Sequence, residues 1–311
     1  MRADPRSRSW RVRTRQAWCM AAQVTALVAA QGAAAAAGPA RAADAPGCPL
    51  STLQPRTLWT GQVADWHRPG AGTLDQFGAQ NLQAGPMGLE VVYPRGSYDP
   101  AAVRTAGAPL GGAQFRTPFA GMGLAVGDEV GIRYQVTLAP NFSFMRGGKL
   151  PGLYGGTANT GGKVPEGRDG FSLRFVWQTE GRGALSAYLP TSGRWGTVFG
   201  LGRWRFAAGQ GTVLALVARM NTPGQADGVV AAWADDVLVL YADDVVFRTG
   251  PTLRPDGFLF STFFGGSTPD WATPVDTLAR FGSMAVFRVD LAALGRCAAA
   301  QPDLHLRHEI R

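Results

Sequence analysis

The sequence is poor in the residues that build the commoner metal and hydrolytic sites. Three cysteines and three histidines in 311 residues nearly exclude a Cys/His zinc site. The five glutamates form no tight acidic cluster on one strand face, which disfavours the paired carboxylates of a glycoside hydrolase. Neither lysine has the glycine spacing and the following Ser or Thr of a phosphate-binding loop, and no Gly-x-Ser-x-Gly elbow is evident. We therefore expect no metal and no cofactor.

The positive charge of the chain, formally +8, lies mainly in the first 42 residues. This segment has seven arginines and one acid, so 23 basic and 21 acidic residues remain for the rest, and a nucleic-acid partner is not expected. A basic start, an Ala-rich apolar stretch over 17–37 and small residues on both sides of Arg41 form the pattern of a secretory signal peptide cleaved after Ala42. A disordered Ala-rich tail is the alternative.

Export would leave a chain of 269 residues in the periplasm or the medium. No later stretch of about 20 apolar residues is present, so we expect no membrane span after cleavage. Cys19 would leave with the leader, whereas Cys48 and Cys297 remain near the two ends. Because the destination is oxidising, we predict a disulfide between them, with two unpaired buried thiols as the alternative. This pairing requires the two ends to lie side by side, as in one closed domain.

Short strand-like runs joined by turns dominate the chain from about Leu58 onward. In residues 130–138 and 171–177, apolar side chains alternate with others, which gives each strand one apolar face. The 42 glycines and 21 prolines also favour many strands over a helical bundle. Further strands are expected at 213–221, 229–233, 237–241, 258–264 and 283–289, and a short helix at 291–297.

These patterns predict an all-β fold, an antiparallel β-jelly-roll sandwich whose concave polar sheet faces a long ligand. We expect a monomer. The predicted organisation is a signal peptide (1–42), a linker (43–57), one jelly-roll domain (58–298) and a polar tail (299–311) in which His305 and His308 belong to a frayed end.

Lysine is unusually rare among the basic residues of this sequence. Of thirty, only Lys149 and Lys163 are lysines, and Lys149 lies in a glycine-rich run over 146–156. A lysine can lose its proton when burial or a neighbouring cation lowers its pKa, whereas an arginine effectively cannot. The glycines would let a polymer approach the backbone closely. The alternative is an ordinary surface lysine in a flexible loop.

Four segments together resemble polysaccharide lyase family 14. They are the run GGKLPGLYGG, the strand at 170–177, the turn at 221–228 and the stretch at 260–266. The likeness spans roughly residues 58–290. It implies a β-jelly-roll alginate or polyuronate lyase that acts on an acidic polysaccharide, with the glucuronan lyases of family 20 as structural relatives.

The resemblance also implies which residues act. The family's catalytic lysine matches Lys149, and its Ser-x-Arg pair matches Ser172 and Arg174, which strand alternation already places together on the face away from the core. Of the family's two tyrosines, spaced two residues apart, Tyr188 matches the second, while Ser186 occupies the place of the first.

The chemistry of a uronate lyase suits these residue types. The enzyme removes the C5 proton next to a carboxylate and expels the oxygen on C4, so fixed cations and donors must neutralise the charge that develops. Arg174 and Ser172 suit this task, and Tyr188 can serve as acid, base or both. Lys149 is either the base or a further cation on the carboxylate, and the sequence leaves both roles open.

We expect an exported lyase that cleaves an alginate-like or glucuronan-like polyuronate by β-elimination. A non-catalytic glycan-binding module on the same sandwich is the alternative, supported by the missing tyrosine at Ser186, and a hydrolase is disfavoured by the scarce glutamates. Weaker candidates for contacts with the substrate are Arg133, Gln135, Arg146, Tyr154 and Asn221.

Overall fold

The structure, a computed structural model, describes residues 47–68 and 70–304. The predicted leader and its cleavage site, together with His305 and His308, lie outside the described residues. None of the helices in the described part of the chain has the length and apolarity that a bilayer crossing needs.

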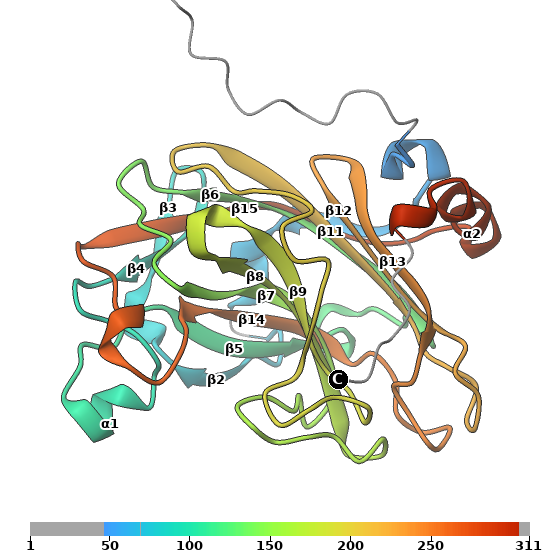
Figure 1. Cartoon of the computed structure of the whole chain (residues 1–311), viewed down its shortest axis with the longest axis horizontal. Coiled ribbons are helices and arrows are strands. Elements are labelled where there is room, and N and C mark those ends of the chain that lie inside the picture. Colours follow the sequence, from blue (N-terminus) through green and yellow to red (C-terminus); the bar gives the residue numbers. More distant parts are fainter. Residues whose placement is uncertain (1–46, 69, 305–311) are drawn as a thin grey trace, which may run out of the picture. The chain divides into compact units, whose positions relative to one another are not determined.

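Two antiparallel sheets are stacked on each other and form the framework of the described chain (Figure 1). The eight-stranded sheet is ordered β13-β12-β11-β6-β15-β4-β3, and β1 pairs with β15 beside this path. Its strands are β1 (Arg56–Gln62), β3 (Leu82–Gly85), β4 (Gly88–Tyr93), β6 (Glu129–Leu138), β11 (Gly211–Arg219), β12 (Gly228–Ala234), β13 (Val237–Val245) and β15 (Thr277–Arg288).

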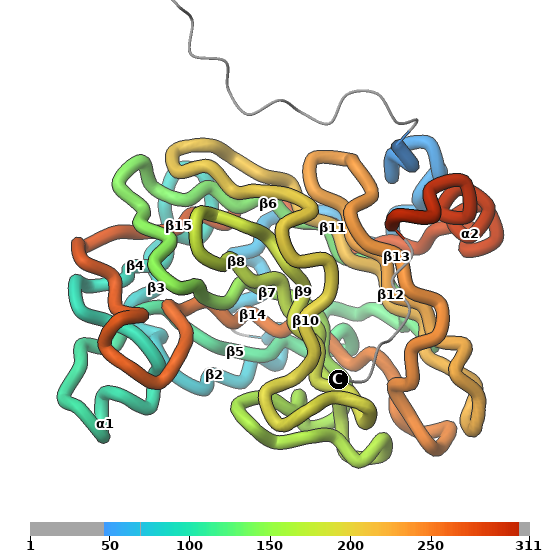
Figure 2. The backbone as a smooth tube through the Cα atoms, in the orientation of Figure 1, coloured from blue at the N-terminus to red at the C-terminus, as the bar shows by residue number. Residues whose placement is uncertain are grey.

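The seven-stranded sheet is ordered β10-β9-β8-β7-β14-β5-β2 (Figure 2). Its strands are β2 (Leu74–Phe77), β5 (Ala113–Pro118), β7 (Gly147–Gly156), β8 (Gly170–Gln178), β9 (Gly183–Tyr188), β10 (Thr197–Phe199) and β14 (Gly257–Phe264). The α-helices are α1 (Ala102–Ala106) and α2 (Leu291–Ala299). Single 3-10 turns are η1 (Leu50–Leu53), η2 (Val63–Trp66), η3 (Ala79–Asn81), η4 (Ala120–Met122), η5 (Thr179–Gly181), η6 (Pro269–Trp271) and η7 (Pro302–Leu304).

The main core lies between the two sheets and follows the predicted alternation. On β8, Phe171, Leu173, Phe175 and Trp177 are fully buried in this core. On β6, the core residues are Val130, Ile132, Tyr134, Val136 and Leu138. The antiparallel jelly-roll sandwich predicted from the sequence is confirmed.

A second apolar cluster covers the outer face of the eight-stranded sheet and joins the two ends of the described chain. The η1 turn and α2 pack there against Trp233, whose Nε1 donates to the Cys48 carbonyl at 2.8 Å. Cys48 and Cys297 form a disulfide, with Cα atoms 5.8 Å apart. The predicted pairing is confirmed, and it ties η1 to the C-terminal helix (Figure 1). The helix predicted at 291–297 is also present, with Asp290 as its N-cap.

Candidate active site

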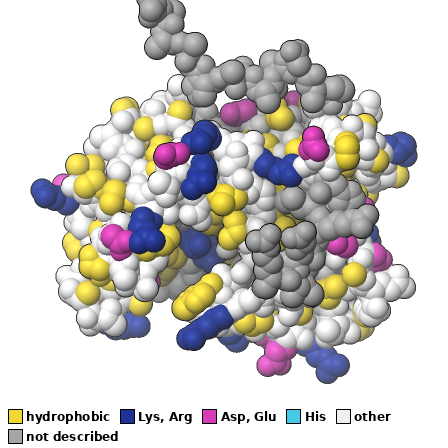
Figure 3. Space-filling view, viewed as in Figure 1, with side chains coloured by type: hydrophobic (Ala, Val, Ile, Leu, Met, Phe, Trp, Pro, Cys, Tyr) yellow, Lys and Arg dark blue, Asp and Glu magenta, His cyan; other side chains and the backbone are white. Residues whose placement is uncertain are grey.

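The site lies on the face of the seven-stranded sheet that points away from the core. Across the sheet, Tyr188 on β9 is opposite Ser172 on β8, and Ser172 is opposite Tyr154 on β7. In the next row across the sheet, Arg174 on β8 is opposite Ser186 on β9. Side chains directly opposite each other in an antiparallel sheet share a face. Figure 3 shows this face hollowed over β7 and β14, with basic side chains at the bottom of the hollow.

An irregularity in β7 brings Lys149 onto this face. Both Leu150 and Leu153 point into the core, although they are three residues apart. The register against β8 shifts between Lys149 and Gly152, so β7 has one extra residue there. In a regular strand, Lys149 would share the core face of Leu153, because side chains alternate with a period of two. The bulge therefore turns the amine to the same side as Tyr154.

The Arg174 side chain extends across the sheet instead of pointing straight out. Its Nη1 donates to Ser261 Oγ on β14 at 3.1 Å, and Ser261 Oγ donates to Gln114 Oε1 on β5 at 2.6 Å. The Gln114 amide then donates to the Gln76 side chain on β2. The intervening strand β7 carries Gly152 opposite Arg174, so no side chain lies between the guanidinium and β14.

Arg174 keeps hydrogen-bonding capacity for a ligand. The residue is only 3% exposed, and its Nε is buried without a partner. Burial lowers the pKa of Arg174 to about 10, a shift that the nearby Tyr188 opposes, so the guanidinium stays charged at neutral pH. A buried cation with an unused donor is suited to a carboxylate ligand, because charge-assisted hydrogen bonds are the stronger ones.

The Lys149 amine has a pKa far below its ordinary value, and it titrates near neutral pH. Burial, and secondly the charge of Arg174, lower the pKa of Lys149 from 10.5 to about 7. The residues opposite Lys149 on the neighbouring strands are Val176 on β8 and Phe263 on β14, and both are uncharged. Among the described residues, no carboxylate forms an ion pair with this amine. Near pH 7 a large fraction of Lys149 is therefore a neutral amine that can accept a proton.

Tyr188 and Ser172 are both linked to the loop that connects β7 and β8. The hydroxyl oxygen of Tyr188 accepts from the Gly162 N–H at 3.3 Å, so its own proton is free to be donated elsewhere. Ser172 Oγ donates to the Asn159 carbonyl at 2.6 Å. The serine proton expected to assist Arg174 is thus used to anchor the loop.

Two of the weaker candidates also lie at or beside this face. Tyr154 is 4% exposed, and the Arg116 guanidinium lies 5.5 Å above its ring. Burial raises the pKa of Tyr154 to about 12, so it is a neutral donor. Arg146 immediately precedes β7, where it is paired with Asp270 and lies 5.2 Å above the Trp271 ring. Its charge is compensated within the protein.

Three predicted contacts are placed elsewhere, and the expectation that they line the groove is wrong. Arg133 and Gln135 are on β6 of the other sheet and are exposed on its outer face. Asn221 is fully buried after β11, where its amide donates to three backbone carbonyls and accepts from the N–H groups of Phe247 and Arg248. Alternation identified which side chains share a strand face, but it could not identify the sheet to which the strand belongs.

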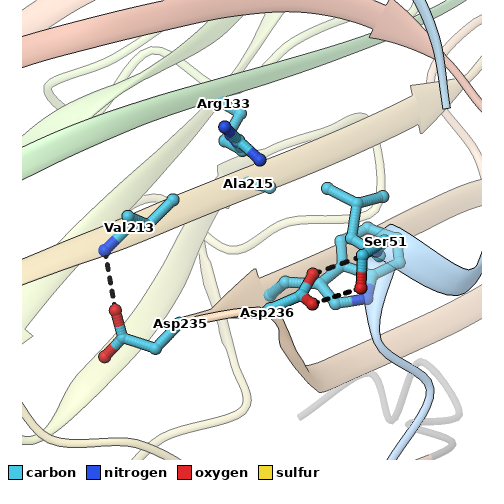
Figure 4. A pocket seen from close by; sticks show the side chains of 8 residues that line it. Ser51, Arg133, Val213, Ala215, Asp235 and Asp236 are labelled. Carbon is cyan, nitrogen blue, oxygen red and sulfur yellow. Dashed lines mark hydrogen bonds between the residues drawn. The ribbon is translucent and has the colours of Figure 1, made fainter.

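Arg133 instead borders a separate pocket of about 390 Å³ on that outer face (Figure 4). Asp236 there accepts from the N–H and hydroxyl of Ser51, and Asp235 accepts from the Val213 N–H. These carboxylates stabilise the β12–β13 turn and η1. Within the described ranges, no group of three or more His, Cys, Asp or Glu side chains could hold a metal ion.

Sequence reasoning missed Ser261, which accepts from Arg174, and Gln114, which accepts from Ser261. Gln114 alternates with the buried Phe115, so its outward face could have been inferred. Ser261 lies in the largely apolar run of β14, where no alternation between polar and apolar residues marks it.

Comparisons with known proteins show the family and the fold of this chain. A family model described as Polysaccharide lyase 14 matches residues 82–284. The PL-14 alginate lyase from Aplysia kurodai is 25% identical over 75% of this chain and 99% of its own, with a TM-score of 0.63. Alginate lyase vAL-1 from Chlorella virus is 20% identical over 75% and 99%, with a TM-score of 0.62. A variant of alginate lyase Aly36B in complex with alginate trisaccharide is 20% identical over 75% and 95%, with a TM-score of 0.60. No curated protein matches the chain.

Proposed function

Since this chain belongs to polysaccharide lyase family 14, we propose that it is an exported enzyme that cleaves a uronate-containing polysaccharide of alginate or glucuronan type by β-elimination. The observation that carries the proposal is the convergence of Lys149, Arg174 and Tyr188 on one polar sheet face. Export is supported by the disulfide between Cys48 and Cys297, since such bonds persist in oxidising compartments.

Arg174 binds the carboxylate of the unit that is cleaved. Its buried Nε lacks a partner, and its Nη1 is held by Ser261, so the guanidinium is oriented before the substrate arrives. A fixed cation stabilises the charge that the carboxylate takes up as the C5 proton leaves, and preorganised groups of this kind contribute strongly to catalysis.

Lys149 acts as the base and Tyr188 as the acid. The neutral Lys149 amine takes the proton from C5, the electron pair of that bond forms the C4–C5 double bond, and the bond from C4 to the glycosidic oxygen breaks. Tyr188 donates its phenolic proton to the departing oxygen. This proton is free to be donated, because the hydroxyl oxygen is the acceptor in its hydrogen bond with the Gly162 N–H. The lowered pKa of Lys149 supports this assignment, because a base works best when its pKa is near the working pH.

The test is product analysis with alginate, glucuronan and related polyuronates. Each cleavage creates an unsaturated sugar at the new non-reducing end, which absorbs in the ultraviolet, and the chain length of the polymer falls. We expect such products from at least one polymer, and none from the Lys149→Ala variant. Retention on a polyuronate column without any unsaturated product would contradict the proposal and favour a glycan-binding module.

A further inference from the structure

The tight turn between β9 and β10 presents an exposed indole at the edge of the sheet. Trp195 is 68% exposed, whereas Trp66, Trp177 and Trp233 are fully buried. The turn itself is well braced, because Ser192 Oγ accepts from the Leu189 N–H at 3.0 Å and donates to a β9 carbonyl at 3.2 Å. The backbone that carries Trp195 is therefore braced before any ligand arrives, which reduces the entropy lost on binding.

This indole has neighbours on part of its surface and is otherwise exposed. The Arg194 guanidinium lies over the ring, 5.1 Å from its centre. The edge of the ring faces Gly162, where a Cβ would lie 3.3 Å from Cζ3 of Trp195. Gly162 also has a φ of +91°, a conformation that favours glycine. The contact with Gly162 limits where the ring can lie, and its 68% exposure leaves surface available to a ligand.

Gly162 links the indole to the proposed catalytic residues. Its N–H donates to the hydroxyl oxygen of Tyr188, while its Cα side faces Trp195. Ser172 anchors the same loop through the Asn159 carbonyl. The loop at 157–169 and the turn at 189–196 lie side by side below β9 (Figure 2). β10 is the edge strand beyond β9, so the turn that carries Trp195 lies at the edge of the sheet next to the strand of Tyr188.

The charges around the indole suit an acidic sugar. Arg194 lies over the ring, and the exposed Lys163 directly follows Gly162 in the sequence; neither forms an ion pair with a described carboxylate. A pyranose has apolar C–H faces that pack on an aromatic ring, and a uronate adds one carboxylate. An exposed indole, with Arg194 over its ring and Lys163 in the adjacent loop, suits both features.

We propose that Trp195, Arg194 and Lys163 form a subsite that binds a second uronate unit of the same polymer, next to the unit held by Arg174. The sugar ring packs against the exposed surface of the Trp195 indole, and its carboxylate is bound by the neighbouring cations. This inference rests on the proposed function and extends it, because it makes cleavage depend on more than one uronate per chain.

The test compares Trp195→Ala with wild type on a polyuronate that wild type cleaves, and on defined oligosaccharides from it. We expect KM for short oligosaccharides to rise about two- to tenfold, with kcat little changed, because a stacked aromatic contact contributes about 0.5–1.5 kcal/mol. Trp195→Phe should restore most of the affinity. Arg194→Gln should make KM less dependent on salt, since screening acts on the charged contact.

The matched control is Met87→Ala, which removes a 62% exposed apolar side chain from the β3–β4 turn of the other sheet and should leave KM unchanged. If wild type produces no unsaturated sugars, the proposed function fails. If wild type is active and Trp195→Ala has the same KM for short oligosaccharides, the subsite is refuted while the proposed function stands. Loss of kcat at unchanged KM would also overturn the subsite.

Discussion

Replacing Lys149 by arginine separates the two roles that a lysine can have at this site. Both residues carry a positive charge, but a guanidinium has a pKa above 12 and cannot take a proton at neutral pH. If Lys149 is the base, Lys149→Arg removes the proton acceptor and keeps the cation. If Lys149 only neutralises the substrate carboxylate, the same change preserves its function.

The expected loss can be estimated from the chemistry of a general base. Such a group contributes about a hundred- to ten-thousand-fold in rate, so kcat of Lys149→Arg should fall by that factor and match Lys149→Ala. The activity of the wild-type enzyme should also fall as the pH is lowered. With a Lys149 pKa of about 7, about half of the enzyme is in the basic form at pH 7 and about a tenth at pH 6. From pH 7 to pH 6, kcat/KM should therefore fall about fivefold, and at lower pH the fall should approach about tenfold per pH unit.

The assay is the initial rate of unsaturated product formation between about pH 5 and about pH 9, which covers roughly two pH units on each side of the Lys149 pKa. Arg104→Lys, an arginine-to-lysine exchange at an exposed position of α1, is the matched control and should retain the wild-type profile. Circular dichroism verifies that each variant is folded. A Lys149→Arg variant with near wild-type kcat would refute the assignment of Lys149 as base and support its role as a cation.

Three further predictions concern the groups around Lys149 and the disulfide. Ser261→Ala should lower kcat/KM about tenfold, because Arg174 loses the hydrogen bond that orients it, and an unchanged value would contradict the role of that bond. Tyr188→Phe should lower kcat about a hundred- to ten-thousand-fold in a folded protein, since the phenolic proton is lost, and wild-type turnover would exclude it as the acid. Replacing both Cys48 and Cys297 by serine should lower the free energy of unfolding by up to about 5 kcal/mol in urea titrations without changing kcat, whereas unchanged stability would contradict the cross-link's role.

Local alternation predicted much of the fold because it is a property of single strands. The pattern around Phe171, Leu173 and Phe175 correctly placed Ser172 and Arg174 on the face away from the core. The same reasoning on β6 separated Arg133 from the core but assigned it to the wrong sheet, because strand order depends on long-range pairing.

The parts of the site that could not be predicted depend on irregular or long-range structure. Lys149 reaches the polar face through a bulge, and strict alternation along β7 gives no sign of it. The hydrogen-bonded row from Arg174 through Ser261 to Gln114 joins strands separated by up to 147 residues in sequence. Ser172 was expected to assist Arg174, but the loop it anchors becomes visible only in three dimensions.

The most direct test of the proposed chemistry is the titration of the Lys149 amine itself. The chain has only two lysines, so a protein labelled with carbon-13 at lysine Cε gives two side-chain signals, and Lys149→Arg identifies which one belongs to the site. We predict a pKa of about 7 for Lys149 in the wild type, and a higher one when Arg174 is replaced by glutamine, because a neighbouring cation disfavours the protonated amine. A Lys149 signal that titrates near the ordinary value of 10.5 would contradict the account.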